Sequence, residues 1–242
     1  EGDISFEDLV YGKINTKCSE LDDFIIARSD GSPTYNLTVV VDDNDMNISH
    51  VIRGEDHISN TPKQMLIYKA LGWTMPKFGH LPMILGSDGK RLSKRHGAKG
   101  TSEYKDLGYL PDTLINYLAL LGWNPGNDDE IFDFNYLLEN FSLDKVNKKS
   151  AVFDTIKLEW VSSQNIFKIP AAKLVDIASE FDPTWCGEGH SLEYLVKVIE
   201  LIKDRIKTLS DIKENAFYFF NHPTEYDEAA MKKCWGENTN DI

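Results

Sequence analysis

Residues 50–85 of the chain read HVIRGEDHISNTPKQMLIYKALGWTMPKFGHLPMIL, and this stretch decides the fold class. It opens with a short strand-like run at 50–53 that Gly54 ends, and it closes with a second run at 78–85, which is apolar. Both runs have the composition of short buried strands. Because two strands joined through a helix form a right-handed crossover, we expect a parallel sheet and an α/β fold.

The segment between these two runs carries the signals of a helix. Thr61 suits the N-cap, Pro62 suits the first helical position, and Gly72 suits the position just beyond the end. After the second strand, the glycine-rich residues 86–89 predict a turn. The apolar side chains expected on the inner face of the helix are Met65, Leu66, Tyr68 and Leu71.

Upstream of this stretch, two more segments carry local signals. Residues 23–28 predict another short buried strand, which the turn formers at 29–33 close. Residues 35–41 are rich in β-branched side chains, so propensity favours a strand there. A helix is the alternative, because sequence rules separate the two poorly in short runs.

Downstream of residue 100 the chain becomes mainly helical. Pro111 opens a helix that we expect to run to Leu121 and to stop at Gly122. A boundary is expected near 169–170, where the α/β part gives way to a helical bundle. The bundle segment keeps a 3.6-residue apolar period in Leu195, Val198, Ile199, Ile202, Ile206 and Leu209.

Composition and charge exclude several classes of protein. The 242 residues suffice for one or two domains, and 41% hydrophobic residues exclude a disordered chain. The net charge of −13 opposes nucleic acid and anionic membranes, so an RNA partner needs a local basic patch. The longest apolar stretch, 114–123, is too short for a bilayer, and no signal peptide is visible. The three cysteines and the histidines show no ligand spacing; we expect a cytoplasmic protein without a zinc or other metal site.

The strongest local anomaly is the basic segment 90–99, which places five cations in ten residues of an acidic chain. Glycines flank it on both sides, and it follows a predicted parallel strand. Because open α/β sheets bind ligands beyond their strand carboxyl ends, such a loop is suited to clamp a polyphosphate. A solvated basic loop is the alternative, and composition alone does not decide between them.

Residues 92–98, Leu-Ser-Lys-Arg-His-Gly-Ala, resemble the second signature of class I aminoacyl-tRNA synthetases, in the form found in bacterial-type glutamyl-tRNA synthetases. We call 90–99 the signature loop. The resemblance is specific through about residue 169 and weaker over 195–220. Further segments resemble that family in the expected order, namely 28–36, 51–57, 61–73, 108–123 and 153–160.

The resemblance implies the C-terminal half of a Rossmann-like nucleotide-binding fold, followed by a helical region and bundle. Residues 1–100 would hold the second half of the catalytic domain, 101–169 a stem-contact region, and 170–242 the start of an anticodon-binding domain. The implied activity is ATP-dependent attachment of glutamate to its tRNA through glutamyl-adenylate. The implied partners are tRNA, glutamate, ATP and the Mg²⁺ that accompanies ATP. We expect a monomer, and the sequence itself leaves the oligomeric state open.

The resemblance also assigns roles within the signature loop. Lys94 aligns with the key lysine, whose charge would stabilise the attacked α-phosphate and the departing pyrophosphate. Arg91 stands where the family usually has a first lysine, and Ser93 and Arg95 would shape the loop as catalytic support. The residues implied to border the adenosine of ATP are Asp56, His57 and Leu85.

Two residues are implied to bind glutamate, Tyr35 and Arg53, because a guanidinium suits a carboxylate. The family carries Tyr35 and Val39 one helical turn apart, so the resemblance favours a helix at 35–41. From the residues alone, Tyr35 could be plain core, Arg53 could pair with Asp42 or Asp43, and His57 could be structural.

The first class I signature, of the type His-x-Gly-His, is absent from the chain. We therefore expect an internal fragment that is inactive alone in adenylate formation, while the full-length parent is a glutamate–tRNA ligase. The alternatives are a paralogue that charges a different amino acid or tRNA, and a non-catalytic RNA-binding or interaction module. The intact loop around Lys94 favours the ligase.

Overall fold

The computed structural model describes residues 2–93, 95, 99–221 and 228–235. The chain forms two compact units. The first, which we call the sheet unit, comprises residues 1–99 and 115–155, and the second, the helical unit, comprises 100–114 and 156–242. This division assigns part of the expected stem-contact region to each unit, and the functional domains at 1–100, 101–169 and 170–242 stay a proposal.

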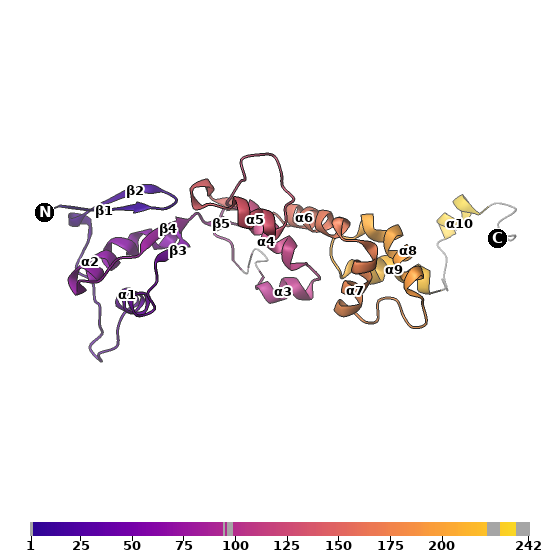
Figure 1. The fold of residues 1–242 in the computed structure, drawn as a ribbon, viewed down its shortest axis with the longest axis horizontal. Coiled ribbons are helices and arrows are strands. Elements are labelled where there is room, and N and C mark those ends of the chain that lie inside the picture. The colour runs from indigo at the N-terminus through magenta and orange to yellow at the C-terminus, as the bar shows by residue number, and fades with distance from the viewer. Residues whose placement is uncertain (1, 94, 96–98, 222–227, 236–242) are drawn as a thin grey trace. The chain divides into compact units, whose positions relative to one another are not determined.

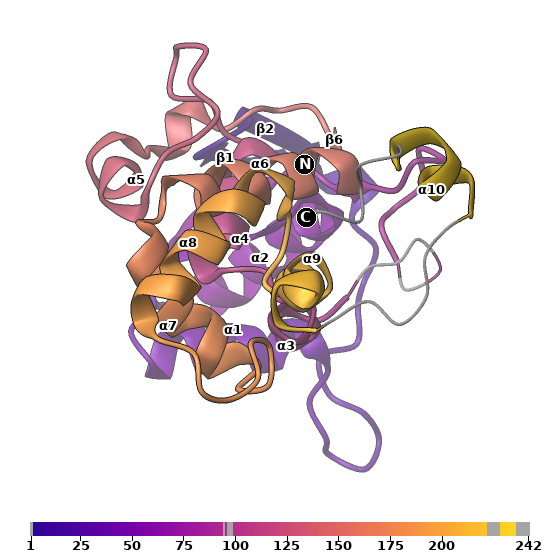
Figure 2. The same cartoon turned by 90° about the vertical axis from the view of Figure 1, so that its right-hand side faces the viewer.

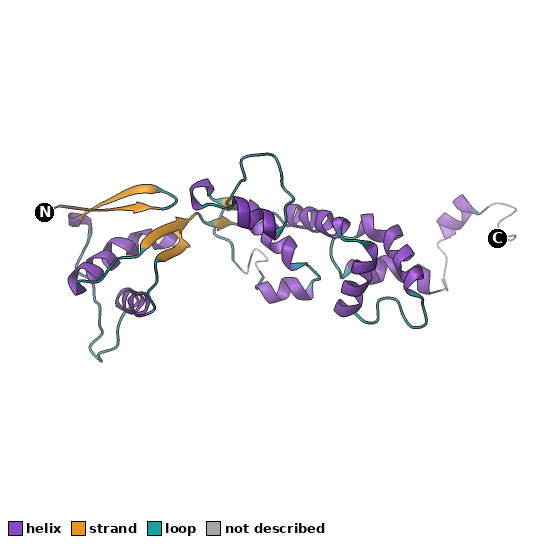
Figure 3. Ribbon diagram, in the orientation of Figure 1, coloured by secondary structure: helices purple, strands orange, loops and turns teal. Residues whose placement is uncertain are grey.

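The sheet unit contains a four-stranded sheet with the order β2-β1-β4-β3 (Figures 1 and 3). β1 (Asp3–Asp8) and β2 (Gly12–Lys17) form an antiparallel hairpin, which the sequence analysis did not predict. β3 (His50–Gly54) pairs in parallel with β4 (Lys77–Leu81), and α2 (Thr61–Leu71) connects them. The parallel strand–helix–strand arrangement is therefore confirmed.

The apolar run at 78–85 is two strands and not the single strand that was predicted. β4 ends at Leu81, and β5 (Ile84–Leu85) pairs in parallel with β6 (Ala151–Val152) in a second sheet. Pro82 lies between them and has no N–H to donate to a ladder. The run therefore leaves the first sheet at this proline.

α1 (Tyr35–Asp45) is a helix, so strand propensity gives the wrong answer for 35–41 and the alternative is right. Its Val40 is 1% exposed and packs with Ile67 and Tyr68 of α2. Burial of one face against α2 outweighs the intrinsic β preference of the branched residues, which is worth about 1 kcal/mol at most.

α2 differs from the prediction at its start and on its inner face. Asn60 is the N-cap, and Thr61 is already helical. Leu66 and Leu71 are exposed, whereas Gln64 is buried. Polar side chains take inner positions here because Arg53 binds them. Gly72 ends the helix in the left-handed region (φ 68°), as predicted.

Residues 23–28 do not form the predicted strand. A single antiparallel bridge joins Ala27 to Pro33, and Ile25 is 72% exposed. The predicted turn at 29–33 is present, since the Gly31 N–H donates to the Arg28 carbonyl. The segment has no neighbouring strand beyond that bridge, so it forms a loop.

The first helices after the signature loop are α3 (Thr101–Asp106), α4 (Pro111–Leu120), α5 (Phe134–Asn140) and α6 (Thr155–Lys168). The helix predicted from Pro111 is confirmed and ends one residue early. A second core of the sheet unit consists of Val10, Trp123, Phe132, Leu137 and Val146.

The helical unit continues with α7 (Ala171–Phe181), α8 (Leu192–Ile202), α9 (Asp211–Phe220) and α10 (Glu228–Cys234). α7, α8 and α9, labelled in Figure 2, contribute side chains to one hydrophobic core. The apolar period at 195–209 does not form one helix, because α8 ends at Ile202 and a 3-10 turn (Lys203–Arg205) follows. Its side chains nevertheless enter that core, as the period predicts.

Candidate functional site

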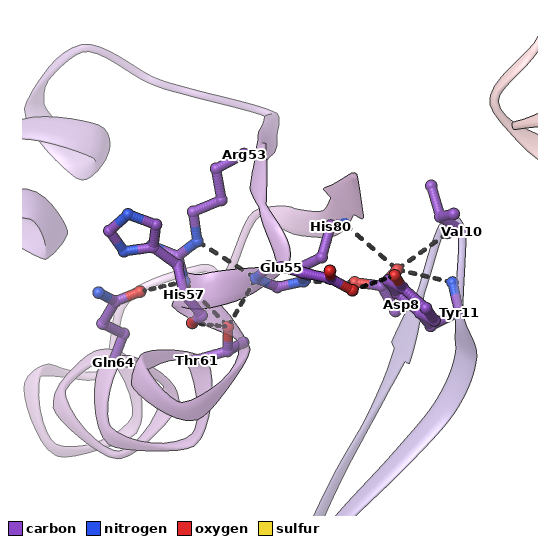
Figure 4. Close-up of polar contacts among 9 residues, drawn as sticks. All are labelled: Asp8, Val10, Tyr11, Arg53, Glu55, His57, Thr61, Gln64 and His80. Carbon is purple, nitrogen blue, oxygen red and sulfur yellow. Dashed lines mark hydrogen bonds and ion pairs between the residues drawn. The ribbon is translucent and has the colours of Figure 1, made fainter. Parts of the chain in front are cut away.

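The candidate site lies at the carboxyl ends of β1, β4 and β3 and extends into the 3-10 segment Glu55–Asn60 after β3. Arg53 of β3 stands in register with His80 of β4, and Asp8 of β1 stands opposite Phe78 of β4. Parallel strands end at the same sheet edge, so side chains from distant positions in the sequence meet there. Figure 4 shows the resulting network.

Arg53 is held by three neutral side chains. Its Nε donates to His80 Nε2 (3.2 Å), and its Nη2 donates to Thr61 Oγ1 (2.9 Å) and Gln64 Oε1 (2.8 Å). Among the described residues, Arg53 forms no ion pair with Asp42 or Asp43, and its Nη1 has no hydrogen-bond partner. The guanidinium therefore keeps both its charge and two N–H donors for a ligand.

The Asp8 and His80 side chains are fully buried, and Asp8 Oδ2 lies 2.6 Å from His80 Nδ1. Asp8 Oδ1 accepts from the backbone N–H groups of Val10, Tyr11 and His80. Burial acts to raise the pKa of Asp8, but the hydrogen bonds from Tyr11, the His80 ring and Val10 outweigh it and hold the pKa below its ordinary value. Burial lowers the pKa of His80 more than the Asp8 carboxylate raises it.

These contacts define one protonation state for His80. Its Nδ1 must carry the proton that Asp8 accepts, and its Nε2 must be free of a proton to accept from Arg53, whose guanidinium has only donors. Thr61 Oγ1 lies 3.1 Å from the same nitrogen. The imidazole is therefore neutral and bridges an anionic carboxylate to a cationic guanidinium.

The lowered pKa values of His80 and Asp8 predict that acid destabilises the sheet unit. Both groups bind protons more tightly when unfolded, so the stability from His80 is complete above about pH 6.5 and is lost as pH falls toward its lower folded pKa. We expect urea titrations between pH 7.5 and 5 to give a slope of up to about 1.4 kcal/mol per pH unit. His80→Asn should flatten this slope, whereas substitution of the exposed His50 should preserve it; equal slopes for His80→Asn and wild type would contradict the assignment.

Tyr35 and His57 come together from α1 and the 3-10 segment. The Tyr35 hydroxyl lies 3.4 Å from His57 Nδ1, and Asn60 Nδ2 lies 3.1 Å from the same atom. Tyr35 is 50% exposed, so it is not part of the core. Gln64, which binds Arg53, also donates to Asn36 Oδ1 (3.1 Å) and so connects the start of α1 to the network.

The base of the signature loop also reaches this site. Arg91 Nη1 donates to Asp56 Oδ2 at 2.9 Å, and Arg91 forms an isolated bridge with Leu85 of β5. The predicted turn at 86–89 is present, closed by the Gly86 N–H on the Lys90 carbonyl (2.7 Å). Arg95 is exposed and Ser93 is partly buried, while Lys94 lies outside the described residues.

Glu55 links the network to the segment that follows β4. Its carboxylate accepts from the Tyr11 hydroxyl and from the backbone N–H of Met83 (3.0 Å). Burial and the adjacent Glu55 carboxylate raise the pKa of Tyr11. The contacts fix the chain at Met83 shortly before β5 and the loop begin.

The structure assigns contacts at the site to residues that the sequence analysis did not single out as functional, namely Asp8, Glu55, Gln64 and His80. Thr61, which was expected only as a helix cap, contacts both Arg53 and His80 through its hydroxyl. Asp8 ends a strand with alternating apolar and polar residues, and that pattern is the one local signal available. Within the described ranges, no group of three His, Cys, Asp or Glu side chains is placed to hold a metal ion. No helix in the described part of the chain combines the length and hydrophobicity that a membrane span needs.

Comparison with known proteins gives two family matches. Residues 1–160 match the family described as tRNA synthetases class I (E and Q), catalytic domain, and residues 172–242 match the anticodon binding domain family. The first match includes the sheet edge with the network described above, and the second includes α7, α8 and α9 of the helical unit.

Individual relatives agree with these matches. The chain is 44% identical to glutamate–tRNA ligase 2 of Halorhodospira halophila over 100% of this chain and 51% of that protein. It is 48% identical to glutamate–tRNA ligase 1 of Syntrophus aciditrophicus over 94% and 48% of the two chains. A crystal structure of a glutamate tRNA ligase from Elizabethkingia meningosepticum, in complex with its amino acid, superposes with a TM-score of 0.88 at 32% identity, covering 98% of this chain and 51% of that one. The chain thus spans about half the length of the curated relatives it matches.

Proposed function

Because the chain belongs to the class I glutamate and glutamine tRNA synthetase family, we propose that the protein containing it attaches glutamate to tRNA through a glutamyl-adenylate made from ATP. The observation that carries this proposal is the convergence of three segments. Tyr35 reaches His57, Arg53 lies at the end of β3, and Arg91 of the signature loop reaches Asp56. Candidate residues for the amino acid and for ATP thus contact the segment that directly follows β3, which supports the proposal.

Arg53 would bind a carboxylate of glutamate. Its Nε and Nη2 are occupied by protein side chains, and its Nη1 offers two N–H donors. Since hydrogen bonds between a guanidinium and a carboxylate are charge-assisted, they supply affinity as well as orientation. Tyr35, half exposed on α1, would donate its hydroxyl to the same ligand.

The signature loop would act on the phosphates. Attack of the glutamate carboxylate on the α-phosphate of ATP forms the mixed anhydride and releases pyrophosphate, so negative charge gathers there. Lys94 would stabilise that charge, with Arg91, Ser93 and Arg95 supporting the loop, and Asp56, His57 and Leu85 would border the adenosine. Asp56 meanwhile binds Arg91, which holds the start of the loop at the site.

Three further assignments belong to this proposal. Mg²⁺ would arrive with ATP on its phosphates, and no step here is routed through it. Residues 172–242 would contact the anticodon arm of tRNA, which the match to the anticodon binding domain family supports. We place the protein in the cytoplasm, where tRNA charging supplies translation.

Lys94→Ala provides the test of the proposal, made in a synthetase that contains this chain. We expect kcat/KM for ATP–pyrophosphate exchange to fall more than about 30-fold, which corresponds to a loss of more than about 2 kcal/mol of transition-state stabilisation. Lys99→Ala, a lysine at the exposed end of the same loop, should change the rate by less than about twofold. The 242-residue chain by itself should give no exchange.

Two results would overturn the proposal. Unchanged exchange in Lys94→Ala would favour a binding module with no catalytic loop. Exchange by the isolated 242-residue chain at the rate of an intact synthetase would contradict its assignment as half of the site.

A further inference from the structure

We propose that Asp8 and His80 are positioning residues, which hold Arg53 through a neutral imidazole so that its Nη1 edge faces the carboxylate of the amino acid. The inference rests on the proposed function in one respect, that the ligand of Arg53 is glutamate. It extends the site from one arginine to a three-residue relay that crosses β1, β4 and β3.

The backbone places the members of this relay in line. Arg53 and His80 are register partners on β3 and β4, and Asp8 lies at the end of β1, on the other side of β4. Both side chains behind Arg53 are fully buried. Water therefore cannot replace either hydrogen bond, and the low dielectric strengthens both.

The direction of each hydrogen bond follows from chemistry. Asp8 Oδ1 already accepts three backbone N–H groups, so Asp8 Oδ2 is the oxygen that faces the ring, at 2.6 Å. The ring proton then sits on Nδ1, and the lone pair of Nε2 points to Arg53 Nε, at 3.2 Å. One tautomer satisfies both neighbours, and the other brings two N–H donors together.

The charges around the ring support the same state. The groups that face His80 are Asp8 from β1, Arg53 from β3, His57 from the 3-10 segment and the neutral Thr61 from α2. A proton on Nε2 would place a second cation against the guanidinium and remove its acceptor. Arg53 would then lose the contact that fixes the Nε side of its plane.

Asp8→Asn tests the relay because it keeps the size of the side chain, removes its charge and replaces one acceptor oxygen with an NH₂ donor. The amide oxygen is expected at the Oδ1 position, where three N–H groups need an acceptor, so the NH₂ faces His80 Nδ1. The ring must then carry its proton on Nε2, against Arg53 Nε–H. Tyr11→Phe is the matched control, since it alters the adjacent contact to Glu55 but keeps the Tyr11 N–H on Asp8.

The first readout is the tautomer, measured on the 242-residue chain by long-range ¹H–¹⁵N spectra of the histidine rings at pH 7. We expect Nδ1–H for His80 in the wild type and in Tyr11→Phe, and Nε2–H in Asp8→Asn. The exposed His50 should give the same spectrum in all three proteins. Nε2–H or a doubly protonated His80 in the wild type would overturn the relay, whatever the enzyme's substrate is.

The second readout compares KM for glutamate with KM for ATP in ATP–pyrophosphate exchange by a synthetase containing this chain. Asp8→Asn should raise KM for glutamate about tenfold or more while KM for ATP stays within about twofold, and Tyr11→Phe should change neither. Equal changes in both constants, or none, would show a merely structural role and reject the proposal. A wild type without any glutamate-dependent exchange would reject the proposed function, and the tautomer spectra would still decide the relay.

Discussion

Asp8→Ala is expected to lower the free energy of unfolding of the sheet unit by about 3–5 kcal/mol, because it removes one side of a buried polar network. The carboxylate accepts three backbone N–H groups and the His80 ring; the donors from Val10 and His80 are buried with it, and the Tyr11 N–H is partly buried. Each buried donor left without an acceptor costs about 1–3 kcal/mol. The substitution also removes the negative charge that faces the Arg53 guanidinium through the His80 ring.

The measurement follows the Ile52 and Gly79 amide signals in urea, since both residues lie in the sheet that Asp8 supports. Asp30→Ala is the matched control. Asp30 also accepts two local hydrogen bonds, from Ser32 N and Ser32 Oγ, but it is exposed, so the expected loss is below about 1 kcal/mol. A loss for Asp8→Ala no larger than that of the control would show that water satisfies the donors and that the network is not a buried one.

The strand–helix–strand core was predictable from sequence because each of its signals is local. Gly72 marks a helix end that needs the left-handed backbone region, and Pro82, which follows the end of β4, could have been used as a local signal as well. At 35–41 the local signal was misleading, since burial of Val40 against α2 decides the helix. The resemblance to a family corrected that assignment, and propensity did not.

The network behind Arg53 could not be predicted in this way. Asp8 and His80 are 72 positions apart, and only the pairing of β1 with β4 brings them together. Hydrophobic periodicity locates buried apolar faces, so it assigned Leu66 to the inner face of α2. The structure buries Gln64 there instead, because a guanidinium must be solvated by polar groups.

Gly108→Ala is expected to destabilise the helical unit by about 3 kcal/mol, the second large effect. Gly108 has φ 80°, where an L side chain costs about 1–2 kcal/mol. A Cβ there would lie 2.6 Å from Ser210 N and 2.9 Å from Leu209 N. Both neighbours are backbone atoms, and Leu209 N–H donates to the Gly108 carbonyl (2.9 Å), so relief requires the two segments to separate. Such overpacking costs about 1–3 kcal/mol more.

Gly189→Ala separates the two contributions within the same unit. Gly189 has φ 85°, and a Cβ there would meet nothing within 4 Å, so it should lose only the conformational part, about 1–2 kcal/mol. The unfolding of this unit in urea is followed by the NMR signal of the indole N–H of the buried Trp185, which donates to Ser179 Oγ within the same unit. Because the two glycines share the same backbone region, the difference between the variants measures the close approach of residues 107–108 to 209–210. Equal losses would mean that this approach is loose enough to accept a methyl group, and that α3 is not held to α9 through it.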